Sequence, residues 1–135
     1  MNEFVCDFPI GNLNQKYKNY FDGDSWIARL SEENTQVIID NVTFAPGSKN
    51  HWHIHHGVQQ ILVCVGGSGW YQEWGKQAIA MQPGDVICIP LGIKHWHDAR
   101  KDCWFAHLSL ISKNELQNGS TEWLESVCQK EYEKL

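Results

Sequence analysis

Four of the seven histidines lie within six residues of one another, at His51, His53, His55 and His56. Successive side chains of a β-strand point to opposite faces, so in an extended segment His53, His55 and Gln59 face the same side. His51 has the same parity but lies one step further along, roughly 6.6 Å from His53, and His56 faces the other side. Clustered imidazoles can bind a metal ion or exchange protons near neutral pH. The chemistry of this protein is therefore expected at this cluster.

A third imidazole on the same site must come from another part of the chain. His95 is the natural supplier, because it follows a Pro-Leu-Gly turn at 90–92 that starts a new strand. The candidate group is three histidines and one glutamine, namely His53, His55, His95 and Gln59. The alternative for the histidines is that they are strand residues with satisfied hydrogen bonds and bind no metal. The alternative for the glutamine is that it only hydrogen-bonds a ligand histidine.

The elements that would carry these side chains are short strands. Between residues 36 and 111, runs of β-branched or aromatic residues alternate with turn-forming pairs such as Pro46-Gly47 and Pro83-Gly84. Strands are expected at 36–44, 52–65, 69–74, 77–81, 86–89, 95–98 and 102–111. Many short strands at near-regular spacing are typical of an antiparallel sandwich or barrel, so the predicted fold class is all-β.

The chain is expected to form one domain, because 135 residues cannot bury two separate cores. Residues 36–112 are predicted to form the barrel. Residues 1–35 are rich in aromatic side chains and are expected to pack on the barrel or on a partner subunit. The last part, 113–135, is expected to contain a short helix, since its apolar residues fall near one stripe after a candidate cap at Ser120 or Thr121.

The segment 58–65 is apolar on both faces of the predicted strand. Ile61, Val63 and Val65 lie on one face, and Leu62 and Cys64 lie on the other. A barrel strand needs to hide only its inner face, so the second face requires cover from the N-terminal segment or from another subunit. This pattern predicts a homodimer.

Composition excludes several classes of partner. The formal net charge is −5 and no cluster of Lys or Arg is present, so nothing in the sequence would neutralise a phosphate backbone or an anionic lipid surface. Neither nucleic acid nor a membrane is expected as a partner. The five cysteines are odd in number, widely spaced and never paired as CxxC, which suits thiols in a reducing cytosol. We therefore expect a cytoplasmic protein that acts on a small molecule.

Two spaced motifs in this chain resemble those of the cupin family. The first has a glycine at each end of the histidine cluster and reads Gly47, His53, His55, Gln59 and Gly66, with glutamine where many cupins have glutamate. The second follows in order and reads Gly84, Pro90, Gly92 and His95, with Ala99 where the pattern usually has asparagine. Over nearly its whole length the chain is similar to small single-domain cupins found beside carboxymuconolactone decarboxylases. That group includes the cupin-fold hydroxynitrile lyases.

This resemblance implies a double-stranded β-helix, the cupin form of the β-barrel or jelly roll. It also implies one divalent metal ion, most often manganese or iron, with nickel or zinc as further possibilities. The implied ligands are His53, His55, Gln59 and His95. Because three imidazoles and an amide add no negative charge, the ion would keep its full charge and act as a strong Lewis acid. Such a site favours anions and non-redox chemistry.

Two more histidines are candidates for proton transfer. His97 has the parity of His95, and His107 alternates with the apolar residues of 104–110. If those apolar residues face an outer cover, His107 faces the pocket. In the lyases that this chain resembles, histidines at these two places line the metal cavity, where a neutral imidazole can accept a proton. His51 and His56 are expected to be structural or surface residues.

The expected activity is that of a hydroxynitrile lyase, which breaks a C–C bond next to a hydroxyl group held at the metal. The substrate would be a small α-hydroxy nitrile or hydroxy-carbonyl compound. Two alternatives stay open, because one fold supports many reactions. The first is a metal-dependent dioxygenase, and the second is a non-catalytic binder of small anions.

Overall fold

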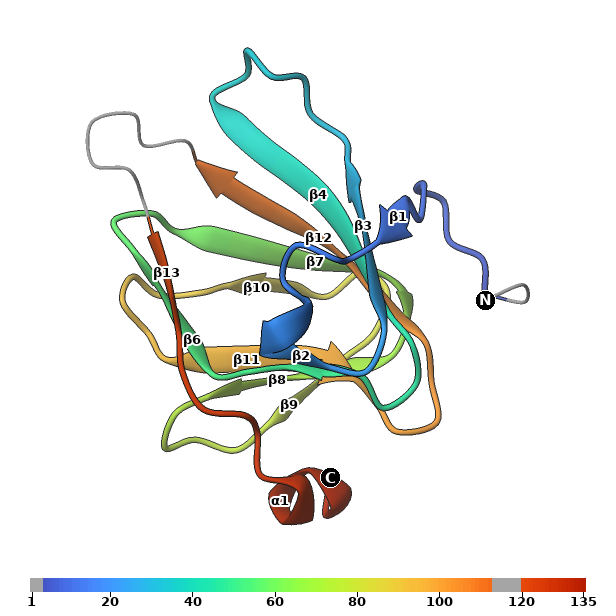
Figure 1. The fold of residues 1–135 in the computed structure, drawn as a ribbon, viewed down its shortest axis with the longest axis vertical. Helices are drawn as coiled ribbons and strands as arrows, with labels where there is room; N and C mark the ends of the chain where they lie inside the picture. The colour runs from blue at the N-terminus through green and yellow to red at the C-terminus, as the bar shows by residue number, and fades with distance from the viewer. Residues whose placement is uncertain (1–3, 113–119) are drawn as a thin grey trace.

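The computed structural model of this chain describes residues 4–112 and 120–135. Two antiparallel sheets face each other and enclose a barrel (Figure 1). The first sheet contains, in spatial order, β1 (Asn12–Leu13), β3 (Ser25–Arg29), β4 (Val37–Phe44), β12 (Phe105–Ser112), β7 (Gln60–Gly67) and β10 (Val86–Cys88). The second contains β13 (Ser120–Trp123), β6 (His53–His56), β11 (His95–Ala99), β5 (Lys49–Asn50) and β2 (Phe21–Asp22), while β8 (Gly69–Glu73) pairs with β11 and with β9 (Ile79–Met81). The expected all-β barrel is confirmed.

The inner face of the first sheet changes from apolar to polar along the barrel. At one end Phe105 on β12 is opposite Phe44 on β4, and both are fully buried in the core. Four residues further along the same strands, Ser109 is opposite Asp40. Because side chains alternate between faces, these residues all point inward. One end of the barrel is therefore closed by the core, and the other end contains polar groups.

Residues 52–65, expected to form a single strand, are divided by a turn. β6 ends at His56 and β7 begins at Gln60. Gly57 between them has a φ of 77°, in the left-handed region that favours glycine. The alternation of faces is therefore interrupted between the two strands, and a parity counted from His53 does not hold beyond residue 56.

The N-terminal residues are built into both sheets. β3 pairs with β4 over five positions, β1 pairs with the outer edge of β3, and β2 pairs with β5. A short 3₁₀ helix, η1 (Lys18–Tyr20), leads into β2. Closer to the terminus, the ring of Phe4 stacks on Trp104 at 5.5 Å between ring centroids. These strands complete the wall of the barrel beside β4.

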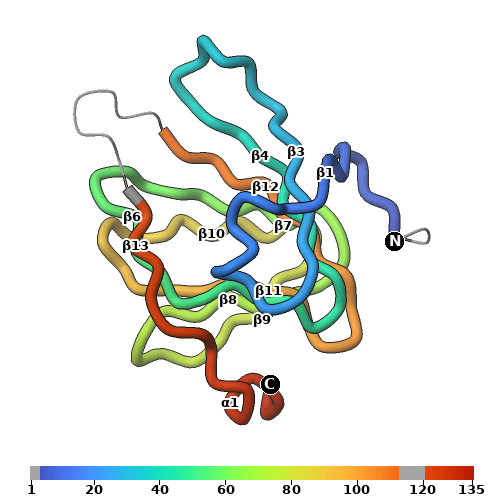
Figure 2. The backbone as a smooth tube through the Cα atoms, in the orientation of Figure 1, coloured from blue at the N-terminus to red at the C-terminus, as the bar shows by residue number. Residues whose placement is uncertain are grey.

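Most of the described C-terminal segment is extended, although a helix was expected there. Only α1 (Gln129–Glu133) is helical, and 120–123 form β13, which pairs with β6 from Ser120 opposite His56 to Trp123 opposite His53 (Figure 2). The expected short helix is confirmed, but it begins at Gln129 rather than after a cap at Ser120 or Thr121. The edge of β6 offers unpaired backbone groups to the returning chain at 120–123, a long-range contact that periodicity does not show. Residues 113–119 lie outside the described residues. No helix among the described residues is long and apolar enough to cross a membrane.

Candidate metal centre

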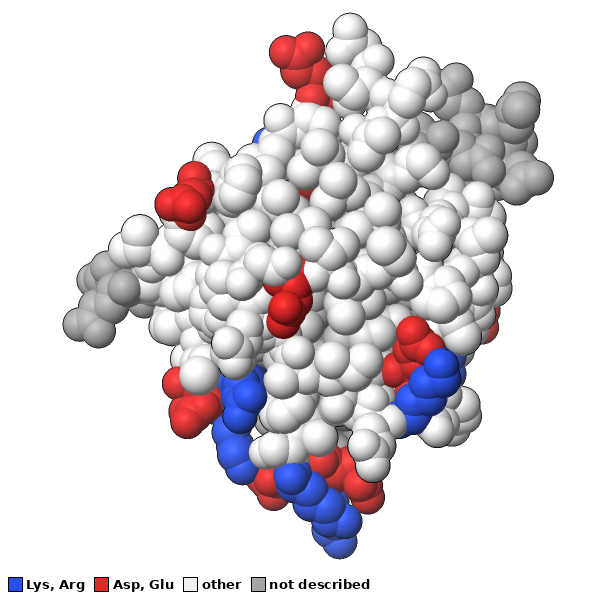
Figure 3. Space-filling view, turned by 180° about the vertical axis from the view of Figure 1, so that it is seen from behind, with Lys and Arg blue, Asp and Glu red and all other residues white. Residues whose placement is uncertain are grey.

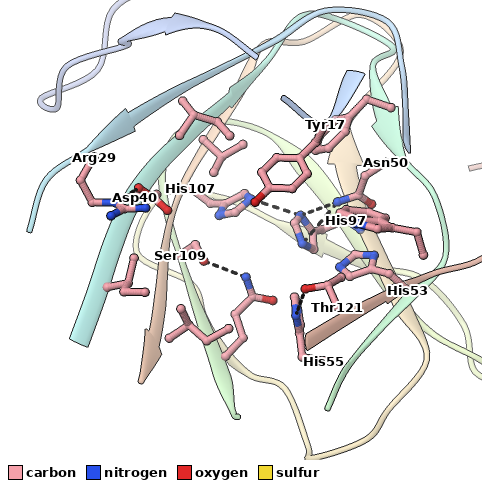
Figure 4. Close-up of a pocket in the computed structure, with 17 residues that line it drawn as sticks. Tyr17, Arg29, Asp40, Asn50, His53, His55, His97, His107, Ser109 and Thr121 are labelled. Carbon is pink, nitrogen blue, oxygen red and sulfur yellow. Dashed lines mark hydrogen bonds and ion pairs between the residues drawn. The ribbon is translucent and has the colours of Figure 1, made fainter. Parts of the chain in front are cut away.

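Two neighbouring strands bring the candidate histidines together. His95 on β11 is directly opposite His53 on β6, and their ring centroids are 4.2 Å apart. His55, two residues along β6 and on the same face, lies 5.1 Å from His53 and 5.4 Å from His95 by the same measure. The expected group of three imidazoles is therefore assembled on the inner wall of the barrel, where Figure 4 shows two of them, His53 and His55.

Each of these imidazoles is held by its Nδ1 atom. The Nδ1–H groups of His53 and His95 donate to the carbonyl oxygens of His51 and Ile93, at 2.8 and 2.9 Å. The third imidazole, His55, is 3.1 Å from Thr121 Oγ1 through the same atom. A histidine anchored in this way presents its Nε2 lone pair for coordination.

Gln59 does not belong to this site, contrary to the expectation from the sequence. Its side chain is exposed, whereas Gln60 is buried, lines the cavity and lies beside His55. The Gln60 Nε2 group donates to Ser109 Oγ at 2.7 Å, and the same side chain interacts with His55. The turn at Gly57 shifts the register of β7 by one residue, so the alternation counted from His53 selected the wrong glutamine.

The spacing of the glycines allows either glutamine. Gly66 follows Gln59 by seven positions, and Gly67 follows Gln60 by seven. Gly67 has a φ of 66°, and a Cβ atom at this position would collide with the carbonyl oxygen of Trp104. The backbone thus requires glycine at 67. If the motif ends at this glycine, the seven-residue spacing places its glutamine at Gln60.

The donor atoms fit a divalent transition ion. Within the described residues, the buried Nε2 atoms of His55 and His95 and the Oε1 atom of Gln60 make no hydrogen bond of standard geometry. Buried polar atoms without partners are costly, and nitrogen and oxygen donors of this kind are ligands of manganese, iron, nickel and zinc. A second possible group shares two members with this one, because nitrogen atoms of His53, His95 and His97 lie within 4.8 Å of one another.

The two glutamines provide a matched test of this assignment. Gln60→Ala is expected to weaken zinc or manganese affinity at least about tenfold, since one donor is lost from the group. Gln59→Ala removes the same atoms from an exposed position and is expected to leave the affinity unchanged. Competition of each variant with a chromophoric chelator measures the difference. A larger effect at Gln59 than at Gln60 would contradict the assignment.

His97 and His107 form a hydrogen-bonded pair in the same cavity. The Nδ1–H group of His107 donates to the carbonyl oxygen of Leu108 at 3.1 Å, so its Nε2 atom accepts. That acceptor lies 3.1 Å from Nδ1 of His97, which therefore carries the proton of the pair. Asn50 positions His97 by accepting a hydrogen bond from its backbone N–H at 3.1 Å. The Nε2 atom of His97 then accepts a long hydrogen bond from the Asn50 side-chain amide, with Nδ2 at 3.4 Å.

Burial keeps these histidines neutral. Desolvation lowers the pKa of His53 and His97 well below the usual 6.5, and it lowers the pKa of His95 and His107 to about 4. The neighbouring imidazoles lower the pKa of His53 and His97 further, because a second positive charge nearby is unfavourable. Neutral rings are the form that can coordinate a metal or accept a proton.

The low pKa of His107 predicts a loss of stability in acid for the metal-free protein. Its unfolded form binds a proton near pH 6.5, but its folded form does so only near pH 4, so unfolding becomes easier as the pH falls between these values. Burial raises the pKa of Asp98, so this carboxyl group has the opposite effect on stability as the pH falls. His107→Phe keeps Asp98 and is expected to flatten the dependence of the unfolding midpoint on pH in thermal melts. An unchanged slope would show that His107 does not contribute.

A cavity of about 310 Å³ with both apolar and polar walls is lined by four of the histidines, namely His53, His55, His97 and His107. Its apolar side chains include Phe21, Ile27, Val42, Ile111 and Trp123. Its polar side chains include His53, His55, Gln60, His97 and His107. A cavity of this size with a few convergent polar groups suits a small organic ligand.

Comparison with known proteins agrees with this architecture. Residues 41–106 match the family model described as Cupin domain. The chain is 34% identical over 94 residues to (R)-mandelonitrile lyase of Granulicella tundricola, which covers 70% of each protein. It is 28% identical over 89 residues to acireductone dioxygenase 4 of Arabidopsis thaliana, covering 56% of this chain and 47% of that protein.

Among solved structures, a cupin-like protein from Thermotoga maritima superposes with a TM-score of 0.82 at 36% identity, over 95% of each chain. A predicted oxalate decarboxylase from the same organism, at 20% identity and a TM-score of 0.63 over 84% of this chain and 96% of that one, shares the fold. This chain therefore belongs to the cupin family, as a small cupin that resembles the cupin-fold hydroxynitrile lyases.

Proposed function

We propose that this protein is a metal-dependent lyase that splits a small cyanohydrin into an aldehyde or ketone and hydrogen cyanide. The observation that carries the proposal is the His97–His107 pair, which shares one cavity with His53 and His55. The likeness to (R)-mandelonitrile lyase supports the same reaction class. One divalent ion, manganese or iron first and nickel or zinc as alternatives, would be held by His53, His55, Gln60 and His95.

When bound, such an ion supplies Lewis acidity, which lowers the pKa of a nearby hydroxyl group. The uncharged donors leave its charge undiminished, so cyanide and other anions are attracted to the site. The protein's own part is to place the substrate and to move its proton.

The histidine pair is oriented to accept that proton. The Nε2 atom of His97 gives up its long hydrogen bond from Asn50 and accepts the hydroxyl proton, while the C–C bond to the nitrile carbon breaks and a C=O bond forms. The electron pair of the broken bond leaves with cyanide. His97 can pass its Nδ1 proton to Nε2 of His107, 3.1 Å away, so the positive charge is shared between two rings until cyanide is protonated. The apolar rings of Phe21 and Trp123 limit access of water.

The test is release of benzaldehyde from mandelonitrile by the purified chain loaded separately with manganese, iron, nickel and zinc. We expect turnover that requires the metal, is removed by a chelator and consumes no oxygen. A screen of aliphatic cyanohydrins and hydroxy acids defines the range of substrates. Absence of carbonyl release with every metal would contradict a lyase.

The second candidate is a dioxygenase, favoured by the 28% identity to acireductone dioxygenase 4. Such a reaction needs open positions for both substrate and oxygen at an iron or manganese ion. An oxygen electrode separates the two functions, because oxygen uptake coupled to substrate loss supports a dioxygenase. Thermal stabilisation by small anions without any turnover would instead support a non-catalytic binder.

We also propose that the protein is a cytoplasmic homodimer. None of its five cysteines, all within the described residues, forms a disulfide, which suits a reducing compartment. On the outer face of the first sheet, Leu108 on β12, Val63 on β7 and Val86 on β10 form an apolar row. Figure 3 shows one broad side of the molecule. Most of its charged side chains lie near the lower end of the view, and few lie above.

A pair of exposed apolar residues tests the dimer. Val86 on the first sheet and Ile79 on the second are 57% and 53% exposed. A lysine at position 86 introduces charge into the proposed interface, so Val86→Lys is expected to be monomeric, whereas Ile79→Lys is expected to remain dimeric. Light scattering coupled to gel filtration gives the mass of each. A monomeric unaltered chain at micromolar concentration would count against the dimer.

A further inference from the structure

A charged pair lies in the same cavity as the histidines and has no part in the proposed reaction. Arg29 on β3 donates from Nε to Oδ1 of Asp40 on β4, at 2.7 Å. The two residues are opposite each other in the register of these strands, and both line the cavity. In Figure 4 the pair lies across the cavity from His53.

The strand registers place this pair one row of side chains from His107. Between β4 and β12, Asp40 is opposite Ser109 and Val42 is opposite His107. Two residues along a strand span about 7 Å. In the row of His107, Val42 contributes an apolar side chain to the inner wall. This spacing suits a ligand with an apolar ring between a reacting group at the histidines and a polar group at the charged pair.

The Arg29 guanidinium has donors available for a ligand. Within the described part of the chain, its bond to Asp40 uses Nε, and the two terminal amino groups are not needed for it. A guanidinium can bind a carboxylate through two parallel hydrogen bonds. The Arg29 side chain is 54% exposed, so its bond to Asp40 contributes little to folding and can be exchanged for a bond to a ligand.

The charge of the surroundings favours an anion at this place. The cavity adjoins a groove of about 300 Å³ that also contains Arg29 and Asp40 in its lining. Lys16 and three amide side chains line the same groove. Among the described residues that line the cavity and the groove, two cationic side chains stand against the single carboxylate of Asp40.

We propose that Arg29 determines specificity by binding a carboxylate at the end of the substrate that lies away from the reacting carbon. The inference rests on the proposed function, which places the reacting hydroxyl at the histidines. The favoured substrate class is a cyanohydrin of an aromatic aldehyde with a carboxylate in the para position. Asp40 holds Arg29 in the cavity wall before the substrate binds and competes with the substrate carboxylate for the guanidinium.

The test is isothermal titration of the zinc-loaded full chain with three stable probes, namely 4-(hydroxymethyl)benzoate, benzyl alcohol and benzoate. The first is expected to bind about five- to tenfold more tightly than benzyl alcohol, as expected for one charge-assisted contact near the surface. Arg29→Gln is expected to remove this preference, and Asp40→Asn to increase it. Lys18→Gln, which removes an exposed cation that lines neither the cavity nor the groove, is the matched control and is expected to keep the preference.

Two results would overturn the inference. One is an equal affinity of the unaltered chain and Arg29→Gln for 4-(hydroxymethyl)benzoate. The other is benzoate binding as tightly as 4-(hydroxymethyl)benzoate, since the carboxylate would then be at the metal. Turnover of mandelonitrile without any carboxylate preference would refute this inference alone. A preference that depends on Arg29, without turnover of mandelonitrile or its 4-carboxy derivative, would support this inference and refute the lyase.

Discussion

Replacing His95 with alanine is expected to remove the metal ion and reduce mandelonitrile cleavage at least about a thousandfold, because a Lewis-acid metal contributes several kcal/mol to such a reaction. His95 is fully buried, its ring lies 4.2 Å from that of His53, and its Nε2 atom is one of the unpartnered donors among the described residues. Its loss removes a direct donor. Metal analysis after gel filtration and benzaldehyde release measure the two effects.

His51 provides the control for this experiment. It lies on the same stretch of chain, but its imidazole is directed to Asp22 at 3.7 Å and does not line the cavity. The bond that His51 makes to the Nδ1–H group of His53 comes from its backbone carbonyl, which alanine retains. His51→Ala is therefore expected to bind metal normally. A full complement of metal in His95→Ala, confirmed as folded by circular dichroism, would refute the proposed ligand set.

Replacing His107 with alanine is expected to lower kcat for mandelonitrile by about a hundredfold to ten-thousandfold, the range for loss of a general acid–base group. The metal content is expected to stay unchanged, because His107 contacts the centre through His97 rather than directly. The variant also leaves space in the cavity beside Phe44 and Phe105. Added imidazole is therefore expected to restore part of the activity, which a merely structural role would not predict.

His56→Ala is the matched control for the proton-transfer assignment. His56 is exposed and pairs with Glu122 at 2.7 Å on the outside of the barrel. Its loss is expected to leave both kcat and metal content unchanged. If His107→Ala, fully loaded with metal, kept the activity of the unaltered chain, His97 would accept the proton without help from His107, and the role given to His107 would be refuted.

Local patterns in the sequence were sufficient to predict most of the barrel. The strands expected at 36–44, 69–74, 86–89 and 95–98 lie within one or two residues of β4, β8, β10 and β11. In these strands apolar and polar residues alternate, or apolar residues follow one another without a break. Turns that contain glycine and proline bound the strands, so neighbouring residues alone determine where they start and end. The two spaced motifs likewise led to the cupin family, which the comparisons confirm.

The C-terminal segment shows where local patterns were insufficient. Trp123 fits a helical stripe and Thr121 was a candidate helix cap, yet both lie in β13 because the edge of β6 is available to them. Thr121 then contributes the hydroxyl group that lies 3.1 Å from Nδ1 of His55. A support for the metal centre thus comes from a residue 66 positions away in the sequence. Such a partner is invisible to any reading of nearby residues.

The sequence by itself determined the fold class and the family, and it singled out His53, His55 and His95 as candidate ligands, because residue types and short spacings carry that information. Only the tertiary structure decided between Gln59 and Gln60. Alternation of faces holds within one uninterrupted strand, and the left-handed turn at Gly57 ends one strand and starts another. After such a turn, the inward face of β7 is set by its pairing with β12, where Ile111 is opposite Gln60.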